Sequence, residues 1–276
     1  MFGSSRALMT SVGCGRFCSA TWVSRAQCGP ISLDFPRGLG HRLQPQWEHQ
    51  GVNVRRFDPR VVSPSLVKFL AACQKEFASH LAGGAALSGV YLQHRLSDDA
   101  DLFVHNAREH RDLVAAAPRI ARSVGMLARP LRDAGTFVRL ELVSADGTVP
   151  IDIVLDEVAD IESPGAPVEE VTVESLTDLR ADKLTCILSR SEPRDLVDLL
   201  VLDRAGFRTE GDLDNALKKD AGLDPAILAF LLRDFPVQPM PQMLIPLGVD
   251  ELRIFRDELA ERLRCCLLYT SDAADE

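Results

Sequence analysis

The chain has 276 residues, 46% hydrophobic and 26% charged, an ordinary globular composition that is long enough to bury a sizeable core without covalent staples. Its net charge of −9 argues against a broad nucleic-acid surface, because a field of that sign repels phosphates, although a local basic patch could still bind RNA. No run approaches the roughly 18 consecutive apolar residues of a membrane span, so we expect a cytoplasmic protein with no membrane partner. The cysteine count of 7 is odd and no Cys or His cluster has zinc spacing, which favours reduced thiols over a disulfide framework.

The two ends differ in composition from the rest of the chain. Residues 1–33 contain no acidic residue and hold Arg6, Arg16 and Arg25, which imitates an organelle transit peptide. We favour a different interpretation, in which residues 1–54 are a translated upstream or disordered leader. The final residues CLLYTSDAADE resemble a translated sequencing adapter. We therefore expect residues 265–276 to be non-native and the natural sequence to be cut off near Arg264.

Hydrophobic periodicity predicts alternating helices and strands in the first half of the patterned sequence. In chain order we expect a helix over 63–78, a strand over 80–82, a helix over 85–94, a strand over 96–105 and a helix over 106–123 that Pro118 interrupts. Strands over 136–143 and 149–155 follow. Between them, Ala145-Asp146-Gly147 has the residue types of a hairpin turn.

From Ser175 onward every predicted element is a helix. The helices cover 176–190, 193–204, 212–220, 225–233 and 249–264, with breaks marked by Gly206, Gly222 and Pro236. The pattern therefore predicts an α/β fold in which a core with a small mixed sheet, residues 55–174, precedes a helical domain, residues 175–264.

Carboxylates gather on two of the predicted strands. In a strand over 96–105, Asp99 and Asp101 share one face about 6–7 Å apart, while Asp98 lies on the other face. Such neighbours raise each other's pKa unless a cation compensates them, and Mg²⁺ prefers oxygen ligands of this kind. Asp152 stands alone between apolar residues of the strand over 149–155. Taken by itself it is open to interpretation as an edge-strand carboxylate facing water, but beside Asp99 and Asp101 it favours a third ligand of a two-metal site.

The Gly83-Gly84 pair lies between a predicted strand and a predicted helix. Backbone N–H groups at such a position bind phosphates, although Gly pairs are also common in plain turns. Its position one helix before the paired carboxylates favours the phosphate-binding interpretation.

Cationic residues lie on the predicted helices after residue 175. Lys183 and Arg190 are seven residues apart on one helix face, and Arg194 opens the next helix. A solvated face is the alternative for such residues, but apolar neighbours surround Lys183. Asp195 and Asp198 are open to interpretation as ion-pair partners of these cations rather than as metal ligands.

Together these residues resemble the AbiEii-type nucleotidyltransferases, toxins of type IV toxin–antitoxin systems with a polymerase-β-like nucleotidyltransferase fold. The resemblance covers residues 57–200. It rests on four elements: Gly83-Gly84 followed by His94-Arg95 and Asp99-Ala100-Asp101; Ile151-Asp152-Ile153; Asp178 with Lys183; and Arg194-Asp195-Leu196-Val197-Asp198-Leu199. Two positions depart from the family pattern, Ala85 in place of Ser or Thr and Ala100 in place of Ile or Leu.

The resemblance implies transfer of a nucleoside monophosphate from an NTP to an acceptor, with release of pyrophosphate. It implies that Asp99, Asp101 and Asp152 hold two Mg²⁺ ions, with Mn²⁺ as an alternative, and that Lys183 is also catalytic. The implied nucleotide-binding residues are Gly83, Gly84, Asp178, Lys183, Arg190, Arg194 and Asp195. The implied acceptor is the 3′ end of tRNA, which basic residues around Arg95, Arg190 and Arg194 would contact, and a separately encoded antitoxin is an implied partner.

Two other functions stay open at this point. The overall acidity suits a cationic small-molecule acceptor such as an aminoglycoside better than it suits RNA. Ala85, which removes a phosphate-contacting hydroxyl, is compatible with a catalytically silent nucleotide-binding module.

Overall fold

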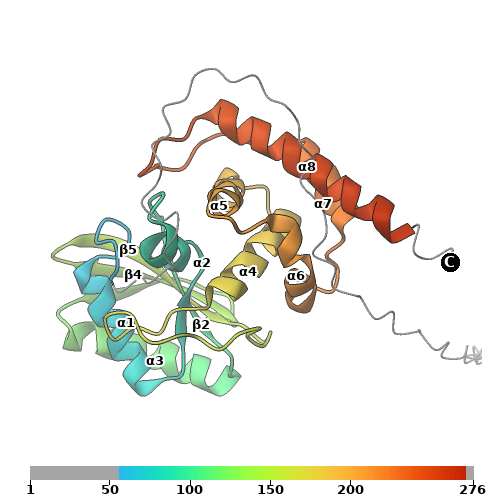
Figure 1. Ribbon diagram of the computed structural model, residues 1–276. Coiled ribbons are helices and arrows are strands. Elements are labelled where there is room, and N and C mark those ends of the chain that lie inside the picture. The colour runs from blue at the N-terminus through green and yellow to red at the C-terminus, as the bar shows by residue number, and fades with distance from the viewer. Residues whose placement is uncertain (1–55, 272–276) are drawn as a thin grey trace, which may run out of the picture. The chain divides into compact units, whose positions relative to one another are not determined.

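A computed structural model describes residues 56–271, with side chains described as far as Cys265 (Figure 1). The predicted leader over 1–54 lies outside the described residues. Residues 272–276, the end of the predicted non-native tail, and the side chains of residues 266–271 also lie outside the described part of the chain. Among the described residues, no helix is both long and apolar enough to cross a membrane.

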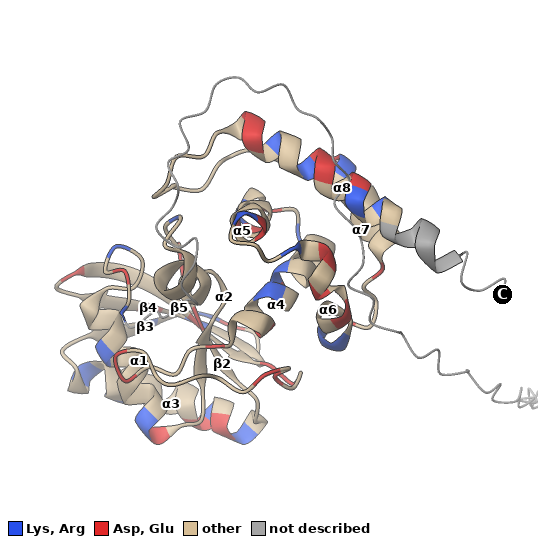
Figure 2. Ribbon diagram, viewed as in Figure 1, with Lys and Arg blue, Asp and Glu red and all other residues tan. Residues whose placement is uncertain are grey.

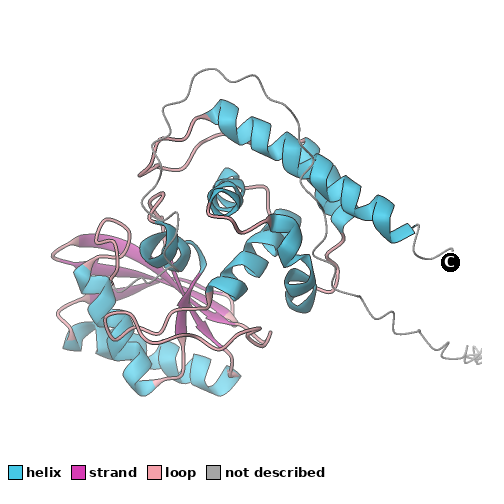
Figure 3. Cartoon of the chain, in the orientation of Figure 1, coloured by secondary structure: helices cyan, strands magenta, loops and turns pink. Residues whose placement is uncertain are grey.

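Five strands form one mixed sheet in the order β1-β2-β5-β4-β3. Figure 3 draws the strands of this sheet in magenta and the helices around it in cyan. Their bounds are β1 His80–Ala82, β2 Ala100–Val104, β3 Leu127–Asp133, β4 Phe137–Ser144 and β5 Gly147–Leu155. Strands β2 and β5 pair in parallel, whereas the other neighbours are antiparallel. The sheet therefore places the carboxylate-bearing strands β2 and β5 side by side.

One face of this sheet is apolar and packs on helices α1 (Pro64–Glu76) and α3 (Ala107–Ser123). Because side chains alternate along a strand, Leu102 and Ile153 point into this core, and both are fully buried. Asp101 and Asp152 consequently point to the opposite face, toward the helices that follow the sheet. Along α3 and α8, Arg residues are interspersed with Asp and Glu (Figure 2).

The second half is helical, as the pattern predicts. Its elements are α4 Leu176–Ser189, α5 Pro193–Arg204, a 3₁₀ turn Thr209–Asp212, α6 Leu213–Lys219, α7 Pro225–Arg233 and α8 Val249–Ser271. Ser175 caps α4 by accepting the Asp178 N–H, and Asp224 caps α7 in the same way ahead of a proline at its first position. These helices enclose a second apolar core. The predicted fold class, an α/β core with a small mixed sheet followed by helices, is confirmed.

Two predictions around the glycine pair and the carboxylates are wrong in their boundaries. Strand β2 begins at Ala100 and not at Leu96, because the backbone of His94 and Leu96 bonds instead to the distant segment around Met243. Asp99 therefore lies just before the strand. The glycine pair opens the short helix α2 (Gly83–Ala86), which continues as a π-helix over Leu87–Leu92, rather than preceding a helix at residue 85.

Two further differences concern proline. Pro118 does not interrupt α3, because Leu113, Ala117 and Ile120 hold both halves of the helix in the core. The sequence pattern also missed β3, whose residues are mostly exposed and include Pro130. Proline is tolerated there because β3 is an edge strand.

Candidate active site

Asp101 and Asp152 are direct neighbours across the parallel pair of β2 and β5. Adjacent strands lie about 4.8 Å apart, so the two side chains start from neighbouring positions on the same face. Strand β5 is central in the sheet and Asp152 is only 3% exposed, so the interpretation of Asp152 as a water-facing edge residue is wrong. Asp98, by contrast, has a side chain that is 93% exposed, in line with its predicted position away from the other two.

Arg139 on β4 joins Asp152 to Asp99. Its Nε lies 2.7 Å from Asp152 Oδ1, and its Nη2 lies 2.5 Å from Asp152 Oδ2 and 2.8 Å from Asp99 Oδ2. The strand register sets this contact, because Arg139 stands directly opposite Asp152 across β4 and β5. Arg139 was not among the site residues predicted from the sequence. The three carboxylates therefore share one site with one guanidinium.

Asp101 carries the uncompensated charge of this site. Burial, together with the nearby charges of Asp99 and Asp152, raises its pKa to about 7. The potential metal ligands of Asp99, Asp101 and Asp152 are carboxylate oxygens, which Mg²⁺ prefers. A bound divalent cation would relieve the repulsion between these carboxylates that raises the pKa of Asp101. The residues present therefore fit a divalent metal site.

The glycine pair packs directly on this site. Gly83 has φ +64°, and a Cβ on it would lie 2.0 Å from Asp101 Oδ2. A Cβ on Gly84 would lie 2.8 Å from Arg95 Nη2 and 3.0 Å from Ser97 Oγ. Glycine is needed at Gly83 both for its left-handed backbone and for the close approach to the carboxylate.

A second, fully buried ion cluster lies behind the site and centres on Asp198. Its carboxylate accepts hydrogen bonds from Arg95 Nε and Nη2 at 2.7 and 2.8 Å, and it lies 2.8 Å from His94 Nε2 and 2.7 Å from Lys183 Nζ. These partners hold the pKa of Asp198 well below its usual range despite burial. Arg95 is 1% exposed, so the prediction that it contacts RNA is wrong.

Lys183 and Arg190 both form ion pairs with Asp195. Lys183 Nζ lies 3.0 Å from Asp195 Oδ1, and Arg190 forms a bidentate pair with the same carboxylate at 2.8 and 2.9 Å. The interpretation of Asp195 and Asp198 as ion-pair partners is thus confirmed. Burial alone would lower the pKa of Lys183, but Asp198 and Asp195 raise it, so the ammonium stays charged. The positive charges of Lys183 and Arg190 in turn partly offset the rise in the pKa of Asp101.

The two remaining predicted residues lie in different surroundings. Arg194 Nη1 is 3.8 Å from Asp99 Oδ1, at the edge of the carboxylate site. Asp178 instead accepts N–H groups of Ile161 and Glu162 at the start of α4 and pairs with Lys219 at 2.8 Å. The structure therefore brings Arg194 to the carboxylates and places Asp178 in a separate ion cluster.

A cavity of about 220 Å³ opens near the ends of β2 and β5, and none of Asp99, Asp101 and Asp152 is among its lining residues. Its floor includes Phe103 and Val154, which pair with each other two residues beyond Asp101 and Asp152 along the same strands. Asp182 and Thr185 of α4, together with Lys219, line it as well.

The sequence profile described as "Nucleotidyl transferase AbiEii toxin, Type IV TA system" matches residues 68–264, more than half of the chain. The chain belongs to the AbiEii family of nucleotidyltransferase toxins. The matched range contains every residue of the carboxylate site and of the Asp198 cluster. As an AbiEii family member the chain is an enzyme of the nucleotidyltransferase class, which confirms the resemblance seen in its motifs.

Two of the solved structures similar to this AbiEii chain are described as nucleotidyltransferases. A Helicobacter pylori protein described as a nucleotidyltransferase is 18% identical and covers 76% of this chain and 94% of its own, with a TM-score of 0.49. MenT4, a nucleotidyltransferase toxin from Mycobacterium tuberculosis, is 15% identical and covers 74% of this chain and 82% of its own, with a TM-score of 0.48. A search of curated protein sequences gives no significant match.

Proposed function

We propose that the chain transfers a nucleoside monophosphate from an NTP to the 3′ end of tRNA and releases pyrophosphate. The observation that carries this proposal is the pairing of Asp101 with Asp152 on β2 and β5, with Gly83 packed against Asp101. It is supported by membership of the AbiEii family, whose profile names a nucleotidyl transferase toxin of a type IV toxin–antitoxin system.

In this proposal, Asp99, Asp101 and Asp152 hold Mg²⁺, which supplies charge stabilisation to the attacking and leaving oxygens when bound. Asp152 orients the acceptor hydroxyl and takes its proton, the acceptor oxygen bonds to the α-phosphorus, and the bond from that phosphorus to the bridging oxygen breaks. The Gly83 and Gly84 amides and the Arg190 guanidinium hold the triphosphate, while the buried Lys183 contributes its positive charge from the Asp198 cluster. Asp195 positions these two cations by pairing with both.

Arg190 and Arg194 are the proposed contacts to the acceptor RNA. Their side chains are 39% and 22% exposed, respectively, and Arg194 lies beside Asp99. A separately encoded antitoxin is a further proposed partner. Asp178 is proposed to act by fixing the start of α4, which carries Lys183, since its carboxylate bonds the preceding loop.

The acceptor is tested by incubating the full chain with Mg²⁺, each α-labelled NTP and three acceptor classes: bulk tRNA, protein and aminoglycosides. We expect label on tRNA with at least one NTP. Label on the aminoglycoside alone would replace tRNA with a cationic small-molecule acceptor. Label on no acceptor, with nucleotide binding retained, would favour the silent module.

Gly83→Ala tests the contact between the glycine pair and Asp101. We expect the transfer rate to fall about 10²-fold. The new Cβ would lie 2.0 Å from Asp101 Oδ2 and would push this carboxylate out of its position. Gly125→Ala is the matched control, since Gly125 has φ +80° but nothing within 4 Å of the added Cβ. Both variants carry backbone strain, so equal losses of transfer rate would show that crowding at Asp101 is unimportant.

Arg139→Gln tests whether the Arg139 guanidinium competes with a metal ion for the carboxylates of Asp99 and Asp152. Without it the carboxylates keep one more uncompensated charge, so we expect Mg²⁺ to bind roughly tenfold more tightly in isothermal titration. Arg129→Gln on β3 removes an exposed guanidinium paired to the partly buried Glu141 and should leave Mg²⁺ affinity unchanged. Weaker Mg²⁺ binding in Arg139→Gln than in the wild type would contradict this competition.

A further inference from the structure

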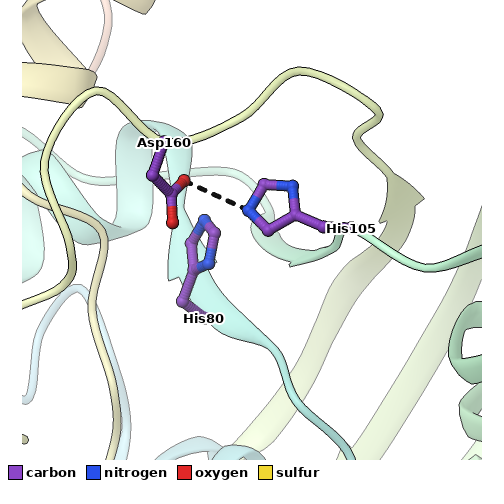
Figure 4. A group of neighbouring side chains, drawn as sticks. All are labelled: His80, His105 and Asp160. Carbon is purple, nitrogen blue, oxygen red and sulfur yellow. Dashed lines mark hydrogen bonds and ion pairs between the residues drawn. The ribbon is translucent and has the colours of Figure 1, made fainter.

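Two histidines and an aspartate converge at the end of β2 that lies away from Asp101. His80 begins β1, His105 directly follows β2, and Asp160 lies in the connection between β5 and α4. One potential ligand atom from each residue lies within 4.8 Å of the other two. Figure 4 shows the three side chains pointing toward one another. Three separate segments of the chain thus present a common set of donors.

The hydrogen bonds of His105 leave one of its ring nitrogens facing a carboxylate. Its Nδ1 lies 2.8 Å from the backbone oxygen of Asp156, which can only accept, so Nδ1 carries the proton. Its Nε2 lies 3.1 Å from Asp160 Oδ1. In a neutral imidazole this places two lone pairs against each other, and they repel unless a cation or a second proton lies between them.

His80 supplies a second, independent sign of a ligand. It is 4% exposed, and its Nε2 has no hydrogen-bond partner among the described residues. A buried nitrogen left without a partner is costly. A neutral imidazole with a free ring nitrogen is the form that binds metals.

We propose that His80, His105 and Asp160 form a Zn²⁺ site. Ligands about 2.0–2.2 Å from a tetrahedral zinc ion lie about 3.3 Å apart, close to the separation of His105 Nε2 and Asp160 Oδ1. Two imidazoles select zinc-like ions, whereas the all-oxygen set of Asp99, Asp101 and Asp152 suits Mg²⁺. The Asp156 carbonyl that fixes the His105 tautomer is the kind of outer partner that zinc-bound histidines have.

The zinc ion would cross-link the sheet to the connection that precedes α4. It would tie β1 and the end of β2 to the connection that carries Asp160. The next two residues, Ile161 and Glu162, donate their N–H groups to Asp178 in the first turn of α4. Three protein ligands also leave the fourth zinc position open to water.

The test measures zinc in the full chain, freed of any affinity tag, after zinc loading and gel filtration. We expect the wild type to retain one zinc ion more than His105→Gln and Asp160→Asn, and each variant to bind zinc at least about 10²-fold more weakly. Glu157→Gln, an exposed carboxylate of the same connection, is the matched control and should retain zinc like the wild type. The Co²⁺-loaded chain should gain d–d bands that are absent in His105→Gln.

Both variant side chains are partly exposed, so circular dichroism should show intact folds. Zinc bound by thiols or by Asp101 would be present in the wild type and in every variant. It therefore does not affect the difference in zinc content between the wild type and a variant. Equal zinc content in the wild type and both variants would overturn the proposal. A wild type that binds no zinc, with His105 doubly protonated by NMR at pH 7, would replace it with an imidazolium–carboxylate pair. None of these measurements depends on nucleotide transfer.

Discussion

Asp101→Asn should give a protein that transfers nucleotide far more slowly than the wild type, yet is more stable than the wild type at pH 8 without metal. The folded-state pKa of Asp101 is about 7, raised from 3.8 by burial and by its neighbours Asp99 and Asp152. A raised carboxyl pKa adds stability at low pH, and this stability is lost as the pH rises through 7. The gain from asparagine should therefore be small at pH 4 and reach roughly 2–4 kcal/mol at pH 8.

Urea unfolding of both proteins at pH 4, 6 and 8 measures this difference. Adding Mg²⁺ should stabilise the wild type at pH 8 and leave Asp101→Asn unchanged, since ligands stabilise only the fold that binds them. Transfer should fall by about 10³-fold or more, because metal charge stabilisation contributes several kcal/mol to the transition state. The control Asp98→Asn removes an exposed charge next to the site and should change stability by less than about 0.5 kcal/mol. A stability gain that does not depend on pH would contradict the assigned origin of the shift.

Asp198→Asn should have the opposite effect and destabilise the protein by about 3–5 kcal/mol at pH 7, because it leaves buried cations without their counter-charge. Asp198 is the common acceptor for Arg95, His94 and Lys183, and none of the four side chains is more than 4% exposed. The pKa of Asp198 lies well below 3.8, so its contribution is present above that pH and lost as the pH falls below it.

The matched control is Asp250→Asn, which removes an exposed partner of Arg253 and should cost less than about 0.5 kcal/mol. Equilibrium urea unfolding at pH 7 compares the two variants. Because Asp198 also holds Lys183 behind the carboxylate site, we expect transfer by Asp198→Asn to fall even at temperatures where it stays folded. Equal unfolding midpoints for the wild type and Asp198→Asn would refute the structural role of this cluster.

The sequence predicted the features that depend on local patterns. Alternation along two short strands placed Asp101 and Asp152 opposite the apolar core residues, and periodicity located all five helices of the second half. The predicted β2 strand was too long at its start, because the hydrogen bonds of His94 and Leu96 to the Met243 segment cannot be read from neighbouring residues. Such tertiary contacts override local strand propensity.

The missed residues depend on register and topology. Arg139 belongs to the site because β4 and β5 pair with Arg139 opposite Asp152, a register that alternation alone does not fix. His80, His105 and Asp160 are spaced 25 and 55 residues apart, unlike the short spacings that make zinc sites recognisable in sequence. The sequence indicates that Asp198 forms an ion pair. Only the fold shows which residues it pairs with.

The most direct test of the proposed chemistry follows both ends of the triphosphate. The full chain is incubated with Mg²⁺, tRNA and an NTP labelled at either the α- or the γ-phosphate. We predict that the α-label enters tRNA, that the γ-label leaves as pyrophosphate in equal amount, and that Asp152→Asn does neither. Transfer of the γ-label to tRNA, or full α-label incorporation by Asp152→Asn, would contradict a nucleotidyltransferase centre built on Asp99, Asp101 and Asp152.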